Sequence, residues 1–157
     1  MDLSRHPDEW TSSTLYAEDL EVGDVFDLGS CVVTEQEVME FASAWDPQFF
    51  HVDAQAAADG LFGGLIASGI HTMAVFQRLS VAGFWGRSAT IAARGMRDVR
   101  FVRPVRPAAE LTGRLTIEEV RPRDDRALVS VSGVLEGPDG PVLTLQLDAY
   151  LARHSPA

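Results

Sequence analysis

The stretch FGGLIASGIHTMAVFQRLSVA, residues 62–82, decides how this chain folds. Glycines and other small residues dominate its first part, and a run that is apolar on most sides extends from residue 68 to residue 82. A helix that is apolar all round is normally surrounded by protein. The sequence therefore predicts a central helix over residues 68–82, entered through a loop of small residues.

A second helix is predicted before this loop. Thr34 begins it, and Glu37 stands three residues on as the partner in a capping box. One buried stripe at helical spacing is predicted for Val38, Phe41, Ala42 and Trp45. Pro47 stops the helix, because the residue before a proline disfavours helical backbone. Residues 46–53 therefore form a turn at the end of a helix.

The remaining sequence is dominated by strand-like runs. The first covers residues 25–33, and four more follow the central helix at residues 92–102, 110–120, 126–135 and 142–152. One strand, two helices and then an antiparallel meander indicate an α+β fold in which a sheet wraps one long helix. We expect a polar tail over residues 1–17 and a single domain over residues 18–157.

The composition of the chain narrows its possible functions. Its 157 residues are 46% hydrophobic, which is enough for one compact domain. The net charge of −10 argues against nucleic acid as a partner, because phosphates require basic surfaces. No apolar run approaches the roughly 18 residues that span a membrane, and the first residues do not form a signal peptide. We expect a cytoplasmic protein that does not bind membranes.

No metal or organic cofactor is predicted. Cys31 is the only cysteine, so neither an internal disulfide nor a thiolate cluster can form. Its alternating neighbourhood predicts a buried strand thiol rather than a nucleophile. No set of histidine, cysteine and acidic residues has a trustworthy metal-ligand spacing, and neither a phosphate loop nor a dinucleotide fingerprint is present.

The chemistry-bearing residues cluster around the turn. Asp46 and His51 place a carboxylate and an imidazole on one short segment, directly before the small-residue entry of the central helix. Such a pair suits acid/base catalysis, and a helix N-terminus binds anions. An Asp-Pro turn with a nearby histidine is by itself common in proteins. The small-residue entry to the helix, residues 62–69, is the second motif, and its presence favours catalysis.

These two motifs, together with Val99-Arg100-Phe101-Val102-Arg103-Pro104-Val105, resemble the MaoC-type acyl dehydratases, a family that includes R-specific enoyl-CoA hydratases. The resemblance covers residues 22–153. It implies a hot-dog fold, a homodimer or a dimer of dimers, and reversible hydration of a 2-enoyl-CoA thioester as substrate. The family motif Asp-x-Asn-Pro-x-His matches at Asp46 and His51, but Gln48 and Phe49 replace its Asn and Pro, which leaves the substrate size open.

The resemblance also implies site roles. Asp46 and His51 would be catalytic, and the backbone N–H of Gly69 would bind the thioester oxygen. The implied substrate-binding residues are Gln48, Phe49, Gly64, Ser68 and Gln77. Candidate ligands of the CoA phosphates are Arg87, Arg94, Arg97, Arg100 and Arg103, although strand alternation lets only some of them face the ligand.

The chemistry fits these roles on physical grounds. Hydration requires a group that takes a proton from water, a group that delivers one to the α-carbon, and a donor for the enolate oxygen. A carboxylate and an imidazole are in complementary states near neutrality, and we expect burial to raise the pKa of Asp46. Glycine at position 69 lets a ligand approach the backbone closely.

Several nearby residues have simpler interpretations. Asp53 is expected to cap residues 54–60 or to orient His51, and His71 to be packed or partly exposed. Trp45 is expected in the core, Gly63 and Gly64 are expected to form the loop, and residues 121–126 form a solvated hairpin tip.

Two other functions remain open. A hot-dog thioesterase is disfavoured, because its acidic residue usually lies on or beside the central helix and residues 68–82 contain no acid. A non-catalytic acyl-thioester binding or assembly subunit is the other alternative, given the changes at Gln48 and Phe49.

Overall fold

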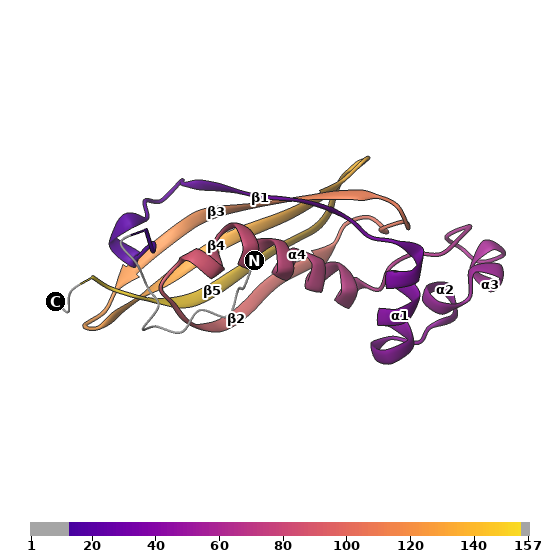
Figure 1. The fold of residues 1–157 in the computed structure, drawn as a ribbon, viewed down its shortest axis with the longest axis horizontal. Helices are drawn as coiled ribbons and strands as arrows, with labels where there is room; N and C mark the ends of the chain where they lie inside the picture. The colour runs from indigo at the N-terminus through magenta and orange to yellow at the C-terminus, as the bar shows by residue number, and fades with distance from the viewer. Residues whose placement is uncertain (1–12, 155–157) are drawn as a thin grey trace.

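A five-stranded antiparallel sheet curves around helix α4 (Figure 1). The structure is a computed structural model, and it describes residues 13–154. The strands are β1 (Val25–Val32), β2 (Thr90–Phe101), β3 (Glu110–Pro122), β4 (Arg126–Gly137) and β5 (Gly140–Ala152), in the spatial order β1-β3-β4-β5-β2. All five predicted strands are confirmed, and the arrangement is the expected hot-dog fold.

The helices are α1 (Glu35–Trp45), α2 (Phe49–Val52), α3 (Ala54–Ala58) and α4 (Gly69–Gly83), with 3-10 helices η2 (Ala17–Asp19) and η3 (Trp85–Arg87). The predicted capping box is present, because Thr34 accepts from the Glu37 N–H and Glu37 accepts from the Thr34 N–H. Helices α1 to α3 gather at one end of the molecule, beside the N-terminus of α4 (Figure 1). The two predicted motifs are thereby brought to the same end.

The core lies between α4 and the concave face of the sheet. Along β3 the side chains of Leu111, Leu115 and Ile117 alternate inward and are buried, as the period of a strand requires. Phe76 of α4 packs its ring directly over Gly133 of β4, where any Cβ would overlap the ring. A side chain at position 133 would therefore push α4 away from the sheet.

Helix α4 is enclosed on one side only, which corrects the expectation that protein surrounds most of it. Val75, Phe76 and Leu79 are buried against the sheet, whereas Ile70 is 54% exposed and Gln77 is also exposed. A single curved sheet can cover only part of a helix surface. The uncovered apolar side is available to another chain or to a ligand.

Trp45 lies outside the core, which corrects a second expectation. It is 76% exposed, although Val38 and Ala42 of the same stripe are fully buried. Trp45 is the last residue of α1, and the segments that cover Val38 and Ala42 do not reach it. Helical spacing identifies the face of a residue, but only the neighbouring elements decide how far along the helix that face is covered.

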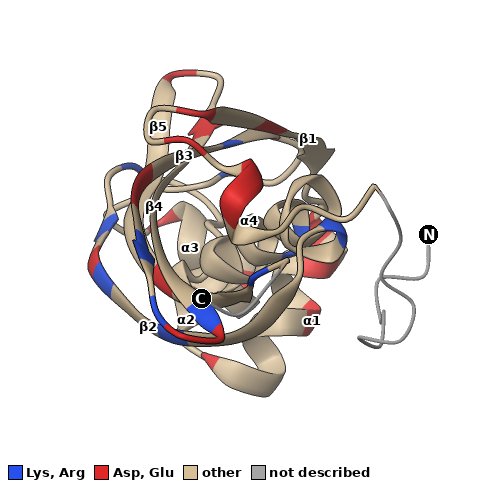
Figure 2. Cartoon of the chain, turned by 90° about the vertical axis from the view of Figure 1, so that its left-hand side faces the viewer, with Lys and Arg blue, Asp and Glu red and all other residues tan. Residues whose placement is uncertain are grey.

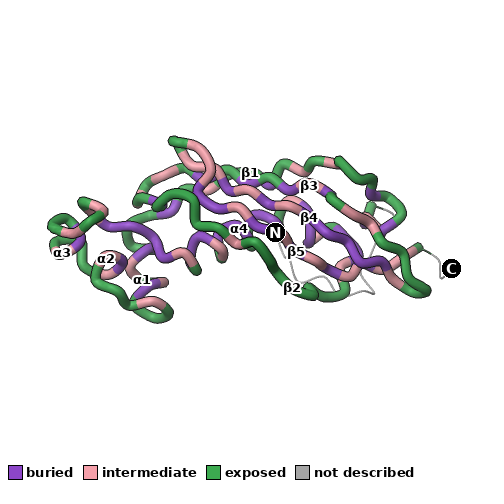
Figure 3. Tube along the Cα trace, turned by 180° about the vertical axis from the view of Figure 1, so that it is seen from behind, coloured by how far each residue is buried: buried purple, intermediate pink, exposed green. Residues whose placement is uncertain are grey.

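Strand β2 is a free edge of the sheet. It pairs with β5 on one side through a register interrupted by three irregularities, and most of its residues are exposed (Figure 3). Its exposed apolar side chains are Ile91, Met96 and Phe101, and basic residues follow the same strand (Figure 2). A long unpaired edge with apolar side chains is a template for pairing with another strand.

The described part of the expected tail packs on the domain. Thr14 and Ala17 are buried, and Leu15 forms an isolated bridge with Ser88, so residues 13–17 belong to the folded unit. Residues 1–12 lie outside the described part of the chain. Between residues 13 and 154, no helix has the length and apolar character needed to cross a membrane.

Candidate active site

Asp46 sits at the C-cap of α1, where the chain leaves the helix toward Pro47. Its Oδ2 accepts a hydrogen bond of 2.7 Å from the Ser68 hydroxyl, and its Oδ1 accepts one of 2.8 Å from the Gln48 side-chain amide. Ser68 is completely buried at the N-cap of α4 and also accepts from the Ile70 N–H. One hydroxyl thus fixes both the carboxylate and the first turn of α4.

These two donors hold the pKa of Asp46 below its ordinary value, the Ser68 hydroxyl first and the Gln48 amide second. The direction is opposite to the expectation from burial. The Asp46 side chain is 24% exposed, so its loss of hydration is smaller than the stabilisation that hydrogen bonds give to the charged form. Asp46 is therefore a carboxylate at neutral pH.

His51 lies on α2, which corrects the prediction that residues 46–53 form a turn outside regular structure, because the His51 N–H donates to the Gln48 carbonyl and the Asp53 N–H to the Phe49 carbonyl. His51 is buried, with only 5% of its side chain exposed. Its Nδ1 lies 2.7 Å from the carbonyl oxygen of Ile66, and the Ile66 N–H in turn donates to the Phe50 carbonyl. A carbonyl can only accept, so Nδ1 carries the proton and, in the neutral ring, Nε2 is an acceptor. The Phe50 ring packs edge-on against the imidazole.

The two predicted catalytic groups meet. His51 Nε2 lies 3.5 Å from Asp46 Oδ2, which is longer than a direct N–H···O hydrogen bond. When the His51 ring is neutral and Asp46 is ionised, both atoms are hydrogen-bond acceptors. They can therefore be linked only by a proton donor that bridges them. A water molecule, with two O–H groups, is such a donor.

Gly69 begins α4 beside this pair, and its N–H has no hydrogen-bond partner within residues 13–154. Phe101 of β2 covers the glycine so closely that a Cβ at position 69 would lie 2.8 Å from the ring. The absence of a side chain here therefore serves the packing of Phe101 as well as access to the N–H.

A cavity of about 260 Å³ lies beside His51 and Gly69. His51, Gly69 and Thr72 line one side of it, and residues 101–105 line the other. Residues 101–105 belong to a segment that carries the family resemblance, and of these five only Arg103 was predicted to contact the ligand. A hydrogen bond of 2.8 Å from the Ala67 N–H to the Val105 carbonyl holds this segment against the entry to α4.

Three predicted substrate-binding residues lie away from this cavity. Phe49 is 52% exposed and packs against Phe50, and Gly64 lies beside the Arg106 guanidinium. Gln77 lines a different cavity farther along α4. Spacing in the sequence could not reveal this, because the direction of each side chain depends on the elements packed around it.

The five arginines predicted as candidate ligands of the CoA phosphates also lie in different places. Arg103 lines the His51 cavity, although one of its nitrogens donates to the Pro141 carbonyl at 2.8 Å. Arg100 lines a groove on the outer face of the sheet, and Arg97 pairs with Asp148 at 2.7 Å. Arg94 also lies near Asp148, and Arg87 lies over the ring of Phe26.

The simpler interpretations are largely confirmed. Asp53 caps α3 by accepting from the Ala56 N–H at 3.0 Å, and residues 121–125 are exposed at the tip between β3 and β4. His71 is buried and stacks on Phe41, and this burial lowers its pKa.

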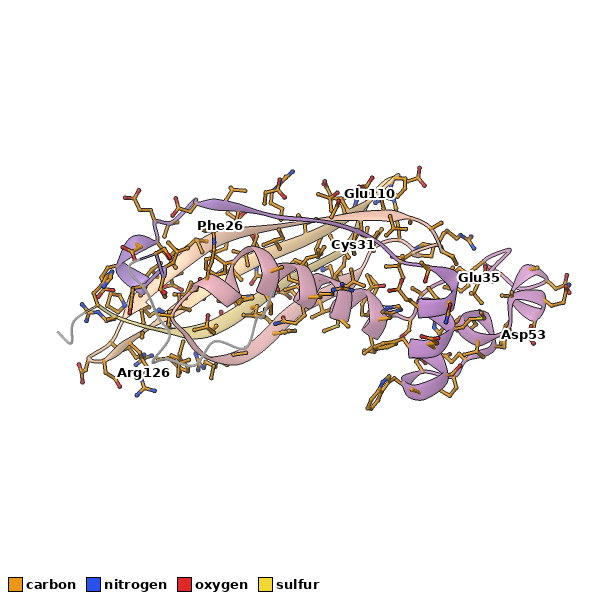
Figure 4. The ribbon with its side chains drawn as sticks, viewed as in Figure 1. Phe26, Cys31, Glu35, Asp53, Glu110 and Arg126 are labelled. Atoms are coloured by element: carbon orange, nitrogen blue, oxygen red, sulfur yellow. The ribbon has the colours of Figure 1, made fainter. Side chains whose placement is uncertain are left out.

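Cys31 is half-buried on the inner side of β1 (Figure 4), and the pKa of its thiol is raised by burial, which makes it a poor nucleophile. Within residues 13–154, no group of three histidine, cysteine or acidic side chains is arranged to hold a metal ion.

Ser68→Ala should raise the pKa of Asp46, because it removes the main donor to the carboxylate. The acid limb of kcat/KM should then move to higher pH, and loss of the N-cap should lower stability by about 1 kcal/mol. Ser80→Ala, at an equally buried serine of α4 that donates to the Gln77 carbonyl, is the matched control and should leave the pH profile in place. An unmoved acid limb in Ser68→Ala would show that this hydrogen bond does not tune Asp46.

Comparison with known proteins agrees with this geometry. The sequence profile of the MaoC like domain matches residues 19–136. The uncharacterized protein YdeM of Bacillus subtilis is 40% identical over 66% of this chain and 71% of its own length. The 3-hydroxyacyl-thioester dehydratase Z of Mycobacterium tuberculosis is 34% identical over 67% of this chain and 73% of its own length.

Solved structures give the same assignment. The MaoC-like dehydratase from Rhodospirillum rubrum superposes with a TM-score of 0.79 at 34% identity, covering 89% of this chain and 98% of that one. The chain belongs to the MaoC-like family, whose members include hydratases and dehydratases.

Proposed function

We propose that this protein reversibly adds water to 2-enoyl-CoA thioesters, giving 3-hydroxyacyl-CoA. The observation that carries the proposal is the 3.5 Å approach of two acceptors, His51 Nε2 and Asp46 Oδ2, near the Gly69 N–H, which has no hydrogen-bond partner within residues 13–154. These groups provide what hydration requires: a binding position for water, a base, and a hydrogen-bond donor for the enolate oxygen.

In the first step, one water donates its two O–H groups to Asp46 and His51, which leaves an oxygen lone pair directed at the substrate. As that oxygen bonds to C3 of the enoyl group, an O–H bond breaks and its proton passes to the pair. The electrons of the double bond move onto the thioester oxygen. The ionised state of Asp46 favours this role as base.

In the second step, the enolate collapses and C2 takes the proton back from the Asp46–His51 pair, so one water supplies both the hydroxyl group and the new hydrogen. The Gly69 N–H stabilises the charge on the thioester oxygen between the two steps. A donor preorganised at such a position typically contributes about 2.7–4 kcal/mol. We further propose that Arg103, which lines the cavity, is the first candidate to contact the CoA phosphates.

The direct test is a screen of the purified protein against short, long and branched 2-enoyl-CoA thioesters, followed by the loss of the conjugated enoyl absorbance and by detection of the 3-hydroxyacyl product. Product must form with at least one member of the series. Tight binding without turnover would instead support the non-catalytic binding subunit. A cytoplasmic location stays a prediction.

We propose a homodimer that pairs through β2, and light scattering at micromolar concentration should show at least two chains. The support is the free edge of β2 with its exposed Ile91, Met96 and Phe101, of which Phe101 also lines the His51 cavity. Met96→Glu should shift the population toward monomer, because burying an unpaired charge at an interface is costly. A clean monomer for the natural chain would contradict this proposal.

A further inference from the structure

A second cavity lies farther along α4 than the candidate active site. Residues 69, 73, 77 and 81 are spaced by four, so each is a neighbour of the next on the helix surface, in a row that turns gradually around the helix. Gly69 lines the His51 cavity, whereas Gln77 and Val81 line a second cavity of about 380 Å³. Met73 falls midway between them, partly buried against the core.

Strand β2 repeats this order along the opposite wall. Phe101 lines the His51 cavity, Ala93 and Met96 line the second cavity, and Val99 lies between them, partly buried against the core. The lining residues of the two cavities thus follow the same order along α4 and along β2, a line here called the α4–β2 seam, and in that order Met73 and Val99 fall between the two cavities. Methionine is flexible, so the partition at Met73 can yield to an inserted chain.

The second cavity is apolar but contains unpaired donors. Val81, Ala93, Met96, Leu147 and Ala149 supply its apolar lining. Two side chains there, the Gln77 amide and the Trp85 indole N–H, have no hydrogen-bond partner within residues 13–154. The hydroxyls of Ser88 and Thr90 already donate to backbone carbonyls, and among residues 13–154 no charged residue lines the cavity.

The distance between Gly69 and Gln77 along α4 gives the length of an acyl chain that could join the two cavities. Eight residues of α-helix separate Gly69 from Gln77, a rise of about 12 Å. A zigzag alkyl chain with bonds of about 1.5 Å advances roughly 1.3 Å per carbon, so roughly nine carbons separate a thioester at Gly69 from the Gln77 amide.

We propose that the second cavity binds the far end of an acyl chain of about ten carbons that carries a neutral oxygen group, a hydroxyl or a carbonyl. The inference rests on the proposed function, which places the thioester at Gly69. The apolar lining suits the methylene groups, and the unpaired donors suit a neutral acceptor. A terminal carboxylate is disfavoured, because no cation lines the cavity to offset its loss of hydration.

The test compares the binding of saturated ten-carbon acyl-CoAs by the full chain, measured by calorimetry, so that it needs no turnover. The natural protein should bind the ω-hydroxy compound about three- to tenfold more tightly than the unsubstituted one, and the ω-carboxy compound no more tightly than the unsubstituted one. Gln77→Leu should abolish the preference for the hydroxyl. Gln146→Leu, the same change on the outer face of β5, should retain it.

A third variant tests the role of Met73, which falls between the two cavities. Met73→Trp should narrow the seam and weaken binding of the ten-carbon chain more than that of a four-carbon chain. Equal affinities for the two ten-carbon compounds in the natural protein, or a preference that survives Gln77→Leu, would overturn the inference. Gln77→Leu could remove the preference for the hydroxyl in a protein that hydrates none of the matching 2-enoyl-CoAs. That result would support binding of the acyl chain along the α4–β2 seam and would reject the proposed hydratase activity.

Discussion

Asp46→Asn and His51→Ala should each lower kcat on the best enoyl-CoA by about 10²–10⁴, the contribution of a positioned acid or base. The amide of asparagine cannot take a proton from water, and alanine removes the acceptor Nε2 that faces Asp46 at 3.5 Å. Steady-state hydration kinetics, measured after circular dichroism has verified the fold, check this expectation.

The chain offers matched controls for both changes. Asp53→Asn repeats the first substitution seven residues away, where asparagine still caps α3, and His154→Ala repeats the second at an exposed histidine stacked on Tyr16. Both controls should retain the kcat of the natural protein. A folded Asp46→Asn or His51→Ala variant with near-normal kcat would remove that residue from the chemistry.

Gly69→Pro should lower kcat by about 10²–10³, because proline lacks the N–H proposed to bind the enolate oxygen. The backbone can accept the change: position 69 is the first residue of α4, where proline is tolerated, and Ser68 has φ −57° and ψ 144°, which suits a residue before proline. The effect should therefore appear in kinetics rather than as unfolding.

Gly69→Ala is the necessary partner of this variant. Both substitutions add a Cβ that meets the Phe101 ring, but only alanine keeps the N–H. Placing each in a Phe101→Leu background relieves the overlap, because the Phe101 side chain is half-exposed and its loss opens no buried core. Equal kcat in the proline and alanine variants would assign the oxyanion donor to another group.

Local interactions explain what could be predicted from the sequence. The Thr34–Glu37 box and the Asp53 cap involve residues three apart, so their spacing alone identifies them. Asp46 and His51 are likewise only five residues apart, which keeps them near each other, although the hydrogen bond of His51 to the Ile66 carbonyl, 15 residues away, also orients the ring.

The errors all concern contacts between distant segments. The pKa of Asp46 depends on Ser68, 22 residues away, whose hydroxyl reverses the effect expected from burial. Trp45 has the right spacing for the core but lies beyond the segments that cover α1. On β2, Arg100 lines a groove on the outer face while the next residue, Phe101, covers Gly69; alternation gives them opposite faces, but only the packing of the sheet decides which face meets α4.

By itself the sequence determined the elements, their order, the sheet wrapped around a central helix, and the Asp46–His51 pair, because each follows from hydrogen bonds and periodicities within a few residues. The tertiary structure alone decided which donors hold Asp46, that residues 101–105 complete the His51 cavity, and that Gln77 lines a second cavity instead. Those features depend on how α1, α4 and β2 lie relative to one another, and that arrangement is set by the shapes of segments that are far apart along the chain.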